Sequence, residues 1–142
     1  MKFVLAVSLA VVSLQLASGK IFTRCELAEE LLKKQKFEPS SIENWVCLIE
    51  AHSGRDTSKK MMEIGGSIQW GLYQINDQFW CKRGAAGGDC NVACENLVTD
   101  DITQSSICAQ KIFRIHGYQG WYGWRNFCYN SDRLPDLSEC NL

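Results

Sequence analysis

Eight cysteines constrain this chain more than any other feature of its sequence. They are Cys25, Cys47, Cys81, Cys90, Cys94, Cys108, Cys128 and Cys140. An even number of cysteines in a short secreted chain indicates a disulfide framework. Each native bridge would stabilise the fold by roughly 2–5 kcal/mol, mainly by restricting the unfolded chain. The cysteines allow on the order of 100 connectivities, and their spacing alone does not select one.

Zinc binding is the alternative use of cysteines at these spacings. Three residues separate Cys90 from Cys94, which is loosely similar to half of a zinc finger. No His pair or second Cys pair follows at the matching distance, so the spacing favours disulfides. We expect neither a metal nor a cofactor.

Residues 1–19 have the pattern of a secretory signal peptide. Lys2 gives a positive start, an apolar run extends from Phe3 to Leu16, and the small residues Ala17-Ser18-Gly19 follow. Small residues at that point are typical of a signal peptidase site. The alternative is a membrane anchor, but the run is shorter than the roughly 20 residues that a spanning helix needs. We therefore predict a secreted, extracellular protein that begins at Lys20.

The net charge argues against nucleic acid and membranes as partners. The formal charge is −1, and removing Lys2 with the signal leaves −2. Binding to either polyanion draws on an excess of Lys and Arg, which this chain lacks. No linker or repeat interrupts residues 20–142, so we expect one domain, acting as a monomer.

Local patterns predict helices at both ends of the mature chain. Thr23 and Glu26 form a capping box before an amphipathic helix that extends to about Gln35. The segment Ser40-Ser41-Ile42-Glu43 is a second such box, before a helix that ends near Ser53-Gly54. Further helices are expected from Asp101 to Ile115, with Thr99 or Asp100 near the cap, and from Trp121 to Phe127.

One segment between these helices favours a strand. Ser67 to Ile75 is rich in β-forming residues and follows the turn Gly65-Gly66. A second group of glycines, from Gly84 to Gly88, indicates a loop. Helices that flank a small antiparallel sheet give the α+β class.

Short motifs surround the cysteines in a fixed order. They include Cys25-Glu26-Leu27-Ala28, Asn44-Trp45-Val46-Cys47, Gly71-Leu72-Tyr73-Gln74-Ile75-Asn76, Asp101-Ile102-Thr103 and Trp121-Tyr122-Gly123-Trp124-Arg125-Asn126. From Lys20 to Leu142 the chain resembles the c-type lysozyme and α-lactalbumin family, most closely its arthropod branch. The resemblance implies a helical lobe, a small antiparallel β-sheet lobe and a cleft between them. It also implies the disulfides Cys25–Cys140, Cys47–Cys128, Cys81–Cys94 and Cys90–Cys108.

The two positions that carry catalysis in that family are changed here. Lysozymes cleave polysaccharide with one carboxylic acid that donates a proton and one carboxylate that stabilises or attacks the sugar cation. By the resemblance, the acid lies five residues after Cys47, which gives His52, and the carboxylate two residues before Gly71, which gives Gln69. Gln69 is neutral and replaces neither role of a carboxylate.

Five residues are candidates to take over the roles of the two carboxyl groups. His52 could donate a proton, because the end of a helix favours the imidazolium, but a hydrogen-bonded polar residue in a cleft is the favoured interpretation. Glu50 should point away from the direction of His52, because two helical steps turn a side chain by about 200°. Three acids in the right region, Glu63, Asp56 and Asp77, occupy no position with a catalytic role in the family.

The resemblance assigns the rest of the sugar groove to Gln74, Asn76, Phe79, Trp80 and Trp121. Aromatic faces and a few oriented amides suit a flat, hydroxylated sugar ring. Trp45 and Trp124 are expected in the core instead. Some relatives bind calcium between the equivalents of Cys94 and Cys108, but this segment lacks the terminal Asp pair that such a site uses, so no calcium site is expected.

Three functions remain open from the sequence. The first is a non-catalytic protein that binds peptidoglycan or chitin-type N-acetylglucosamine oligosaccharides, in antibacterial defence and innate immunity. The second is an active glycosidase that uses His52 or a displaced carboxylate. The third is a module that binds a protein partner, as α-lactalbumin does; retention on a chitin column would separate it from the first.

Overall fold

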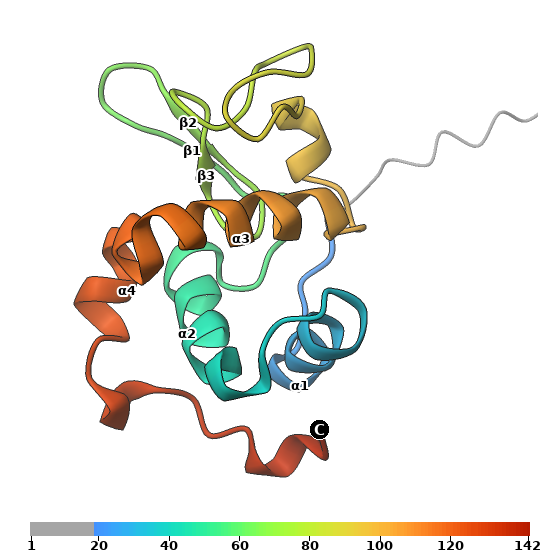
Figure 1. Ribbon diagram of the computed structural model, residues 1–142, viewed down its shortest axis with the longest axis vertical. Helices are drawn as coiled ribbons and strands as arrows, with labels where there is room; N and C mark the ends of the chain where they lie inside the picture. The colour runs from blue at the N-terminus through green and yellow to red at the C-terminus, as the bar shows by residue number, and fades with distance from the viewer. Residues whose placement is uncertain (1–18) are drawn as a thin grey trace, which may run out of the picture.

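A computed structural model describes residues 19–142 (Figure 1). Residues 1–18, nearly all of the predicted signal peptide, lie outside the described residues. The small sheet and its loops occupy one end of the molecule, and α1 (Arg24–Glu29) and α2 (Ile42–Ser53) occupy the other. Helix α3 (Thr103–His116) lies between the two ends, followed by α4 (Tyr122–Phe127). The predicted α+β class is confirmed.

Helix α1 begins at the predicted capping box. The Glu26 N–H donates to Thr23 Oγ1 at 3.2 Å, and the Thr23 N–H donates to Glu26 Oε2 at 2.9 Å. After Glu29 the helix continues as a π-helical turn over Glu30–Lys34, so it ends close to the predicted Gln35. Leu27, Ala28 and Leu31 are fully buried, which confirms the predicted apolar face.

The prediction of a second capping box, at residues 40–43, is wrong. A 3₁₀ turn over Pro39–Ser41 precedes α2, and the Ser41 hydroxyl donates to the Glu38 carbonyl instead of accepting from the helix. Pro39, with its fixed φ, starts the helical path before either serine can act as a cap. The predicted end is correct: α2 finishes at Ser53, and Gly54 follows in the left-handed conformation with φ 60°.

Helix α3 starts two residues later than predicted, at Thr103. The Thr103 N–H and hydroxyl both donate to Asp101 Oδ1, at 2.9 and 2.7 Å. Asp101 therefore forms the turn that leads into the helix, in place of Thr99 or Asp100. Helix α4 matches its predicted range within one residue.

The predicted strand from Ser67 to Ile75 is two strands. In the described chain, β1 (Lys60–Met62), β2 (Ile68–Trp70) and β3 (Ile75–Asn76) form an antiparallel sheet in that order. A tight turn separates β2 from β3, with φ 71° at Gly71 and 49° at Gln74. A Cβ on Gly71 would lie 1.8 Å from the carbonyl oxygen of Leu97, in the 3₁₀ helix Cys94–Leu97. The turn packs so closely against the Leu97 backbone that position 71 accommodates no residue with a Cβ.

All eight cysteines pair as the resemblance implied. Cys25–Cys140 ties α1 to the C-terminal 3₁₀ helix Ser138–Cys140, and Cys47–Cys128 ties α2 to the end of α4. The other two bridges hold the loops of the β lobe, one of them to α3. Zinc binding by these cysteines is therefore excluded.

The core lies between the helices and the sheet and is rich in aromatic rings. Trp45 is 2% exposed and packs edge-on against Phe37, Tyr73 and Trp121. Its predicted core position is confirmed. Trp124 is partly buried against the same core, and its indole N–H donates to Asn44 Oδ1 at 3.0 Å.

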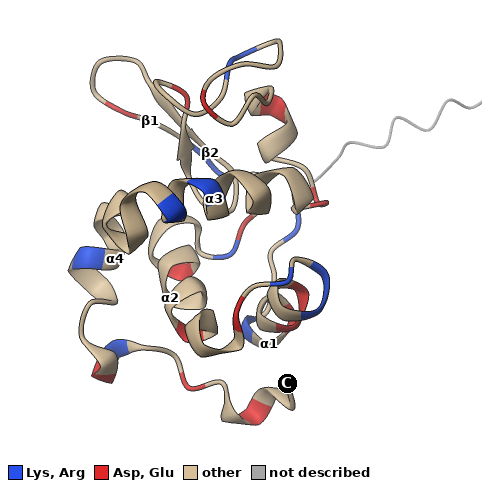
Figure 2. Ribbon diagram, viewed as in Figure 1, with Lys and Arg blue, Asp and Glu red and all other residues tan. Residues whose placement is uncertain are grey.

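The charged residues are dispersed. Figure 2 shows Lys and Arg interspersed with Asp and Glu over both the helical and the sheet lobes. Two further 3₁₀ helices, Gly117–Gly120 and Ser131–Arg133, flank α4. Within residues 19–142, every helix is too short or too polar to cross a membrane.

Candidate functional site

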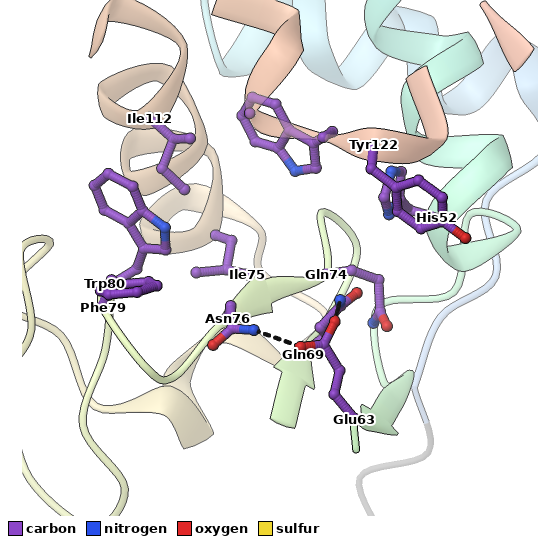
Figure 3. Close-up of a pocket in the computed structure, with 12 residues that line it drawn as sticks. His52, Glu63, Gln69, Gln74, Ile75, Asn76, Phe79, Trp80, Ile112 and Tyr122 are labelled. Atoms are coloured by element: carbon purple, nitrogen blue, oxygen red, sulfur yellow. Dashed lines mark hydrogen bonds between the residues drawn. The ribbon is translucent and has the colours of Figure 1, made fainter. Parts of the chain in front are cut away.

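A groove runs between the sheet and the helices (Figure 3). Its volume of about 280 Å³ is near the lower end of the range for small-molecule sites. All seven residues that the sequence assigned to catalytic or sugar-binding positions line this groove. The lining residues are His52, Glu63, Gln69, Gln74, Ile75, Asn76, Phe79, Trp80, Ile112, Gly120, Trp121 and Tyr122.

His52 lies in the helical wall of the groove, in the last turn of α2. Its side chain is 8% exposed, and its Nε2 accepts a hydrogen bond from the Gly123 N–H at 3.0 Å. Burial, and to a smaller extent the Lys59 ammonium, lower the pKa of His52 to about 4. The ring is therefore neutral near pH 7, with its proton on Nδ1.

The expectation that the helix end favours the imidazolium is wrong. Lys59 Nζ already donates to the His52 carbonyl at 2.7 Å, so a cation occupies the C-terminal end of α2. A proton on Nε2 would also break the bond from the Gly123 N–H. The structure thus supports the interpretation of His52 as a hydrogen-bonded polar residue.

The lowered pKa of His52 gives the protein a defined acid sensitivity. The unfolded chain binds a proton at this ring below a pH of about 6.5, whereas the folded chain does so only below about 4. The resulting stability is fully present above pH 6.5 and is lost as the pH falls toward 4, by up to about 3 kcal/mol. Urea unfolding at pH 7 and pH 4.5 should show this loss in the native chain and not in His52→Gln. Equal losses in both proteins would contradict it.

Gln69 lies on β2, on the sheet side of the groove, and contacts a carboxylate. Its Nε2 donates to Glu63 Oε1. Glu63 Oε2 accepts two further bonds, from Asn76 Nδ2 at 3.0 Å and from the Ser67 hydroxyl at 3.1 Å. Glu63 comes from the hairpin loop between β1 and β2, yet three side chains fix its carboxylate against the floor of the groove (Figure 3).

The other acids considered from the sequence lie outside the groove lining. Glu50 pairs with Arg24 at 2.8 Å, which confirms that it points away from His52. Asp56 accepts from the N–H and hydroxyl of Ser58. Asp77 accepts from the N–H of Ile68, from the indole of Trp70 and from Arg83, and the hydrogen bonds to its carboxylate lower its pKa despite desolvation.

Aromatic side chains form one end of the groove. Phe79 is 58% exposed, and Trp80 stands beside it next to Ile112 of α3 (Figure 3). The ring of His116 meets that of Trp80 edge-on, with the centroids 5.8 Å apart, in a hollow that continues the groove. The exposed ring of Phe79 offers a face on which a sugar could stack.

Trp121 and Gln74 line the groove from more deeply buried positions. Each is 4% exposed. The Trp121 indole donates to the Tyr73 carbonyl at 2.9 Å, and Gln74 Nε2 donates to the carbonyls of Lys59 and Gly71. Their N–H groups therefore hold the groove wall together. Trp121, which the resemblance assigns to the groove, is also part of the buried core.

The acidic and hydroxyl side chains of the segment that binds calcium in some relatives are hydrogen-bonded within this protein. The Thr99 hydroxyl donates to the Asp101 carbonyl at 2.8 Å, and the Thr57 hydroxyl donates to Asp100 at 3.4 Å. Across the described part of the chain, no three or more His, Cys, Asp or Glu residues come together in a way that could hold a metal ion.

Comparison with known proteins agrees with this geometry. Residues 20–140 match the model of the C-type lysozyme/alpha-lactalbumin family. The chain belongs to this family. A lysozyme of Bombyx mori is 51% identical over 125 residues, which cover 87% of this chain and 89% of the relative. Lysozyme-like protein 2 of Homo sapiens is 37% identical over 131 residues, covering 89% and 88% of the two chains.

Solved structures of lysozymes share the fold. A crystal structure of a lysozyme from Litopenaeus vannamei matches with a TM-score of 0.76 at 30% identity, over 87% of this chain and 98% of that one. A lysozyme from Equus asinus matches with a TM-score of 0.73 at 34% identity, over 87% and 100%. The lysozyme fold is therefore established here, and its four disulfides are consistent with an extracellular location.

Five of the lining residues were not assigned to the groove from the sequence, and two of them, Glu63 and Tyr122, carry polar side chains. Glu63 was considered only as a displaced catalytic acid, and its bonds to Gln69 and Asn76 were not foreseen. Tyr122 lines the groove beside His52, with the ring centroids 6.3 Å apart. The sequence offered one signal for this role of Tyr122, namely its position directly after Trp121.

Proposed function

We propose that this protein is a secreted, monomeric, non-catalytic member of the lysozyme family. In this proposal it binds peptidoglycan or chitin-type N-acetylglucosamine oligosaccharides and serves antibacterial defence. What supports the proposal is the pair of neutral side chains, His52 and Gln69, which line the groove at the two positions that the resemblance assigns to the family's catalytic carboxyl groups.

The chemistry of glycoside cleavage supports this view. Cleavage needs a protonated acid near the leaving oxygen and an ionised carboxylate near the sugar cation, usually about 5–10 Å apart. His52 is neutral near pH 7 because its pKa is about 4. A neutral imidazole is too weak an acid to protonate a glycosidic oxygen. The groove also contains one carboxylate, that of Glu63, in place of two.

An active glycosidase is the second candidate, because Glu63 lies in the groove beside Gln69. This carboxylate could support the sugar cation, but the residues that line the groove include no second carboxylic acid to donate a proton. Product analysis on labelled N-acetylglucosamine oligomers and wall lysis between pH 4 and 8 decide the question. Binding without shorter products supports the first candidate. Turnover that is lost in Glu63→Gln or His52→Ala supports the second.

Substituting Trp80 tests the groove itself. We expect Trp80→Ala to weaken binding of an N-acetylglucosamine tetramer about threefold to tenfold, because it removes an aromatic surface from the groove. Tyr129→Ala is the matched control, since Tyr129 is 73% exposed and lies outside the groove lining. Calorimetric titration of the three proteins gives the affinities. Equal affinity in Trp80→Ala and the native chain would place the binding site elsewhere.

A further inference from the structure

The hydrogen-bonding groups of the groove are unbalanced. The side-chain N–H groups of Gln69, Gln74, Asn76 and Trp121 all donate to protein acceptors. The side-chain oxygens are less used. Oε1 of Gln69 and of Gln74 are buried and have no donor within the described chain.

Glu63 adds a negative charge to the groove, whose amide N–H groups are already engaged. It is exposed and is the one charged side chain among the groove-lining residues, since His52 is neutral near pH 7. No Lys or Arg of residues 19–142 forms an ion pair with it. Two lysines that shortly precede it in the sequence are engaged elsewhere: Lys59 on the His52 carbonyl, and Lys60 over the ring of Trp70, 4.9 Å from its centroid.

The carboxylate is also held in place before any ligand arrives. Gln69, Asn76 and Ser67 donate to its two oxygens from β2, β3 and the adjoining loop. A carboxylate oxygen can accept more than one hydrogen bond. Because Glu63 is already ordered, a ligand donor that meets it loses less free energy to side-chain ordering.

Ligand chemistry follows from these properties. An acetamido group presents one N–H donor and one carbonyl acceptor and carries no charge, so it could offer Glu63 one neutral hydrogen bond. An ammonium group presents three donors, no acceptor and a positive charge. A charge-assisted hydrogen bond between an ammonium and a carboxylate is also roughly twice as strong as a neutral one.

We propose that Glu63 makes the groove select sugar chains that carry free amino groups, namely oligosaccharides with de-N-acetylated glucosamine units. The inference rests on the carbohydrate-binding function proposed above and names its preferred ligand class. The donors of Trp80 and Tyr122, toward opposite ends of the groove, remain available for sugar oxygens (Figure 3).

The test compares two oligomers of equal length, the tetramers of glucosamine and of N-acetylglucosamine. Titrations are made at pH 5.5, where the amine is protonated and a glutamate is ionised. We expect the native chain to bind the glucosamine tetramer at least about fivefold more tightly. The ratio should fall as salt is raised, because the preference is partly electrostatic.

Two variants test whether the preference for the glucosamine tetramer arises at Glu63. Glu63→Gln keeps the size of the side chain but removes its charge, and should bring the affinity ratio close to one. Glu43→Gln removes the same charge at an exposed position outside the groove lining, and should keep the native ratio. A ratio that survives in Glu63→Gln would overturn the inference, because the preference would then come from the overall charge.

The remaining outcomes separate this inference from the proposed function. If the native chain binds the N-acetylglucosamine tetramer as tightly as the glucosamine tetramer, the inferred selectivity is wrong. The proposed carbohydrate binding would still stand. Failure of the native chain to bind either tetramer would contradict the proposed function itself, and the selectivity with it.

Discussion

Gly71→Ala is expected to destabilise the protein by about 2–5 kcal/mol. The left-handed backbone at Gly71, with φ 71°, costs an alanine about 1–2 kcal/mol. The added Cβ would also lie 1.8 Å from the Leu97 carbonyl oxygen, so the backbone of one segment must move. Forcing atoms into a packed interior typically costs a further 1–3 kcal/mol or more.

Gly54→Ala separates these two contributions. Gly54 has nearly the same backbone conformation, with φ 60°, but no atom lies within 4 Å of the position that a Cβ would take there. Its loss should be limited to the conformational part, about 1–2 kcal/mol. Urea unfolding at pH 7 gives both values. Equal losses of unfolding free energy at the two positions would show that the contact with Leu97 adds nothing to the cost of the substitution.

The same contact has a consequence for the groove. The Gly71 carbonyl accepts from the N–H of Gln74 at 3.0 Å and from its side-chain Nε2 at 2.9 Å. A backbone shift at Gly71 would therefore move Gln74 and the turn that separates β2 from β3. We expect Gly71→Ala to weaken sugar binding even at temperatures where the variant remains folded.

The cysteine motifs were enough to predict the fold. The disulfide pairing and the lysozyme fold agreed with the prediction, because four bridges and the motifs around them leave little freedom in how the chain is arranged. Local patterns were accurate where the signal was local, as at the capping box of Thr23 and Glu26. They failed at Ser67 to Ile75, where β-forming composition suggested one strand and close packing of Gly71 on Leu97 imposed a turn.

The chemistry of the site was harder to predict than its location. The position of His52 at the end of α2 suggested a raised pKa, but burial and the neighbouring Lys59 lower it, and neither is a property of the local sequence. The place of Glu63 depends on the hairpin loop and on three hydrogen bonds to side chains between four and 13 residues away in sequence. No spacing rule could have placed that carboxylate beside Gln69.

Placing carboxyl groups at residues 52 and 69 of the groove is expected to create a glycosidase. The variant combines His52→Glu, Gln69→Asp and Glu63→Gln. The last two changes exchange amide and carboxylate between neighbouring residues, which keeps a hydrogen bond between them and avoids two adjacent negative charges. Release of reducing ends from peptidoglycan or a labelled hexamer between pH 4 and 8 measures the result.

The variant that lacks His52→Glu is the matched control. It carries the ionised carboxylate but no proton donor, so its rate should be at least about 100-fold lower than that of the full combination. The native chain should release no reducing ends. Equal rates in the control and the full combination would show that residue 52 does not decide catalysis, which would contradict the basis of the proposed function.

The burial of His52 is what makes this combination reasonable. Desolvation, the larger cause of the lowered pKa of the imidazole, disfavours the charged form of any group and should raise the pKa of a carboxyl group at the same position, against the smaller opposing effect of the Lys59 ammonium. A raised pKa keeps a carboxylic acid protonated near neutral pH, as proton donation to a leaving oxygen requires. The acidic and basic limbs of the pH–rate profile should therefore be well separated in the full combination. A profile that falls steadily above pH 4 would show instead that the new acid is ionised like an exposed glutamate, and that the groove wall no longer desolvates this position.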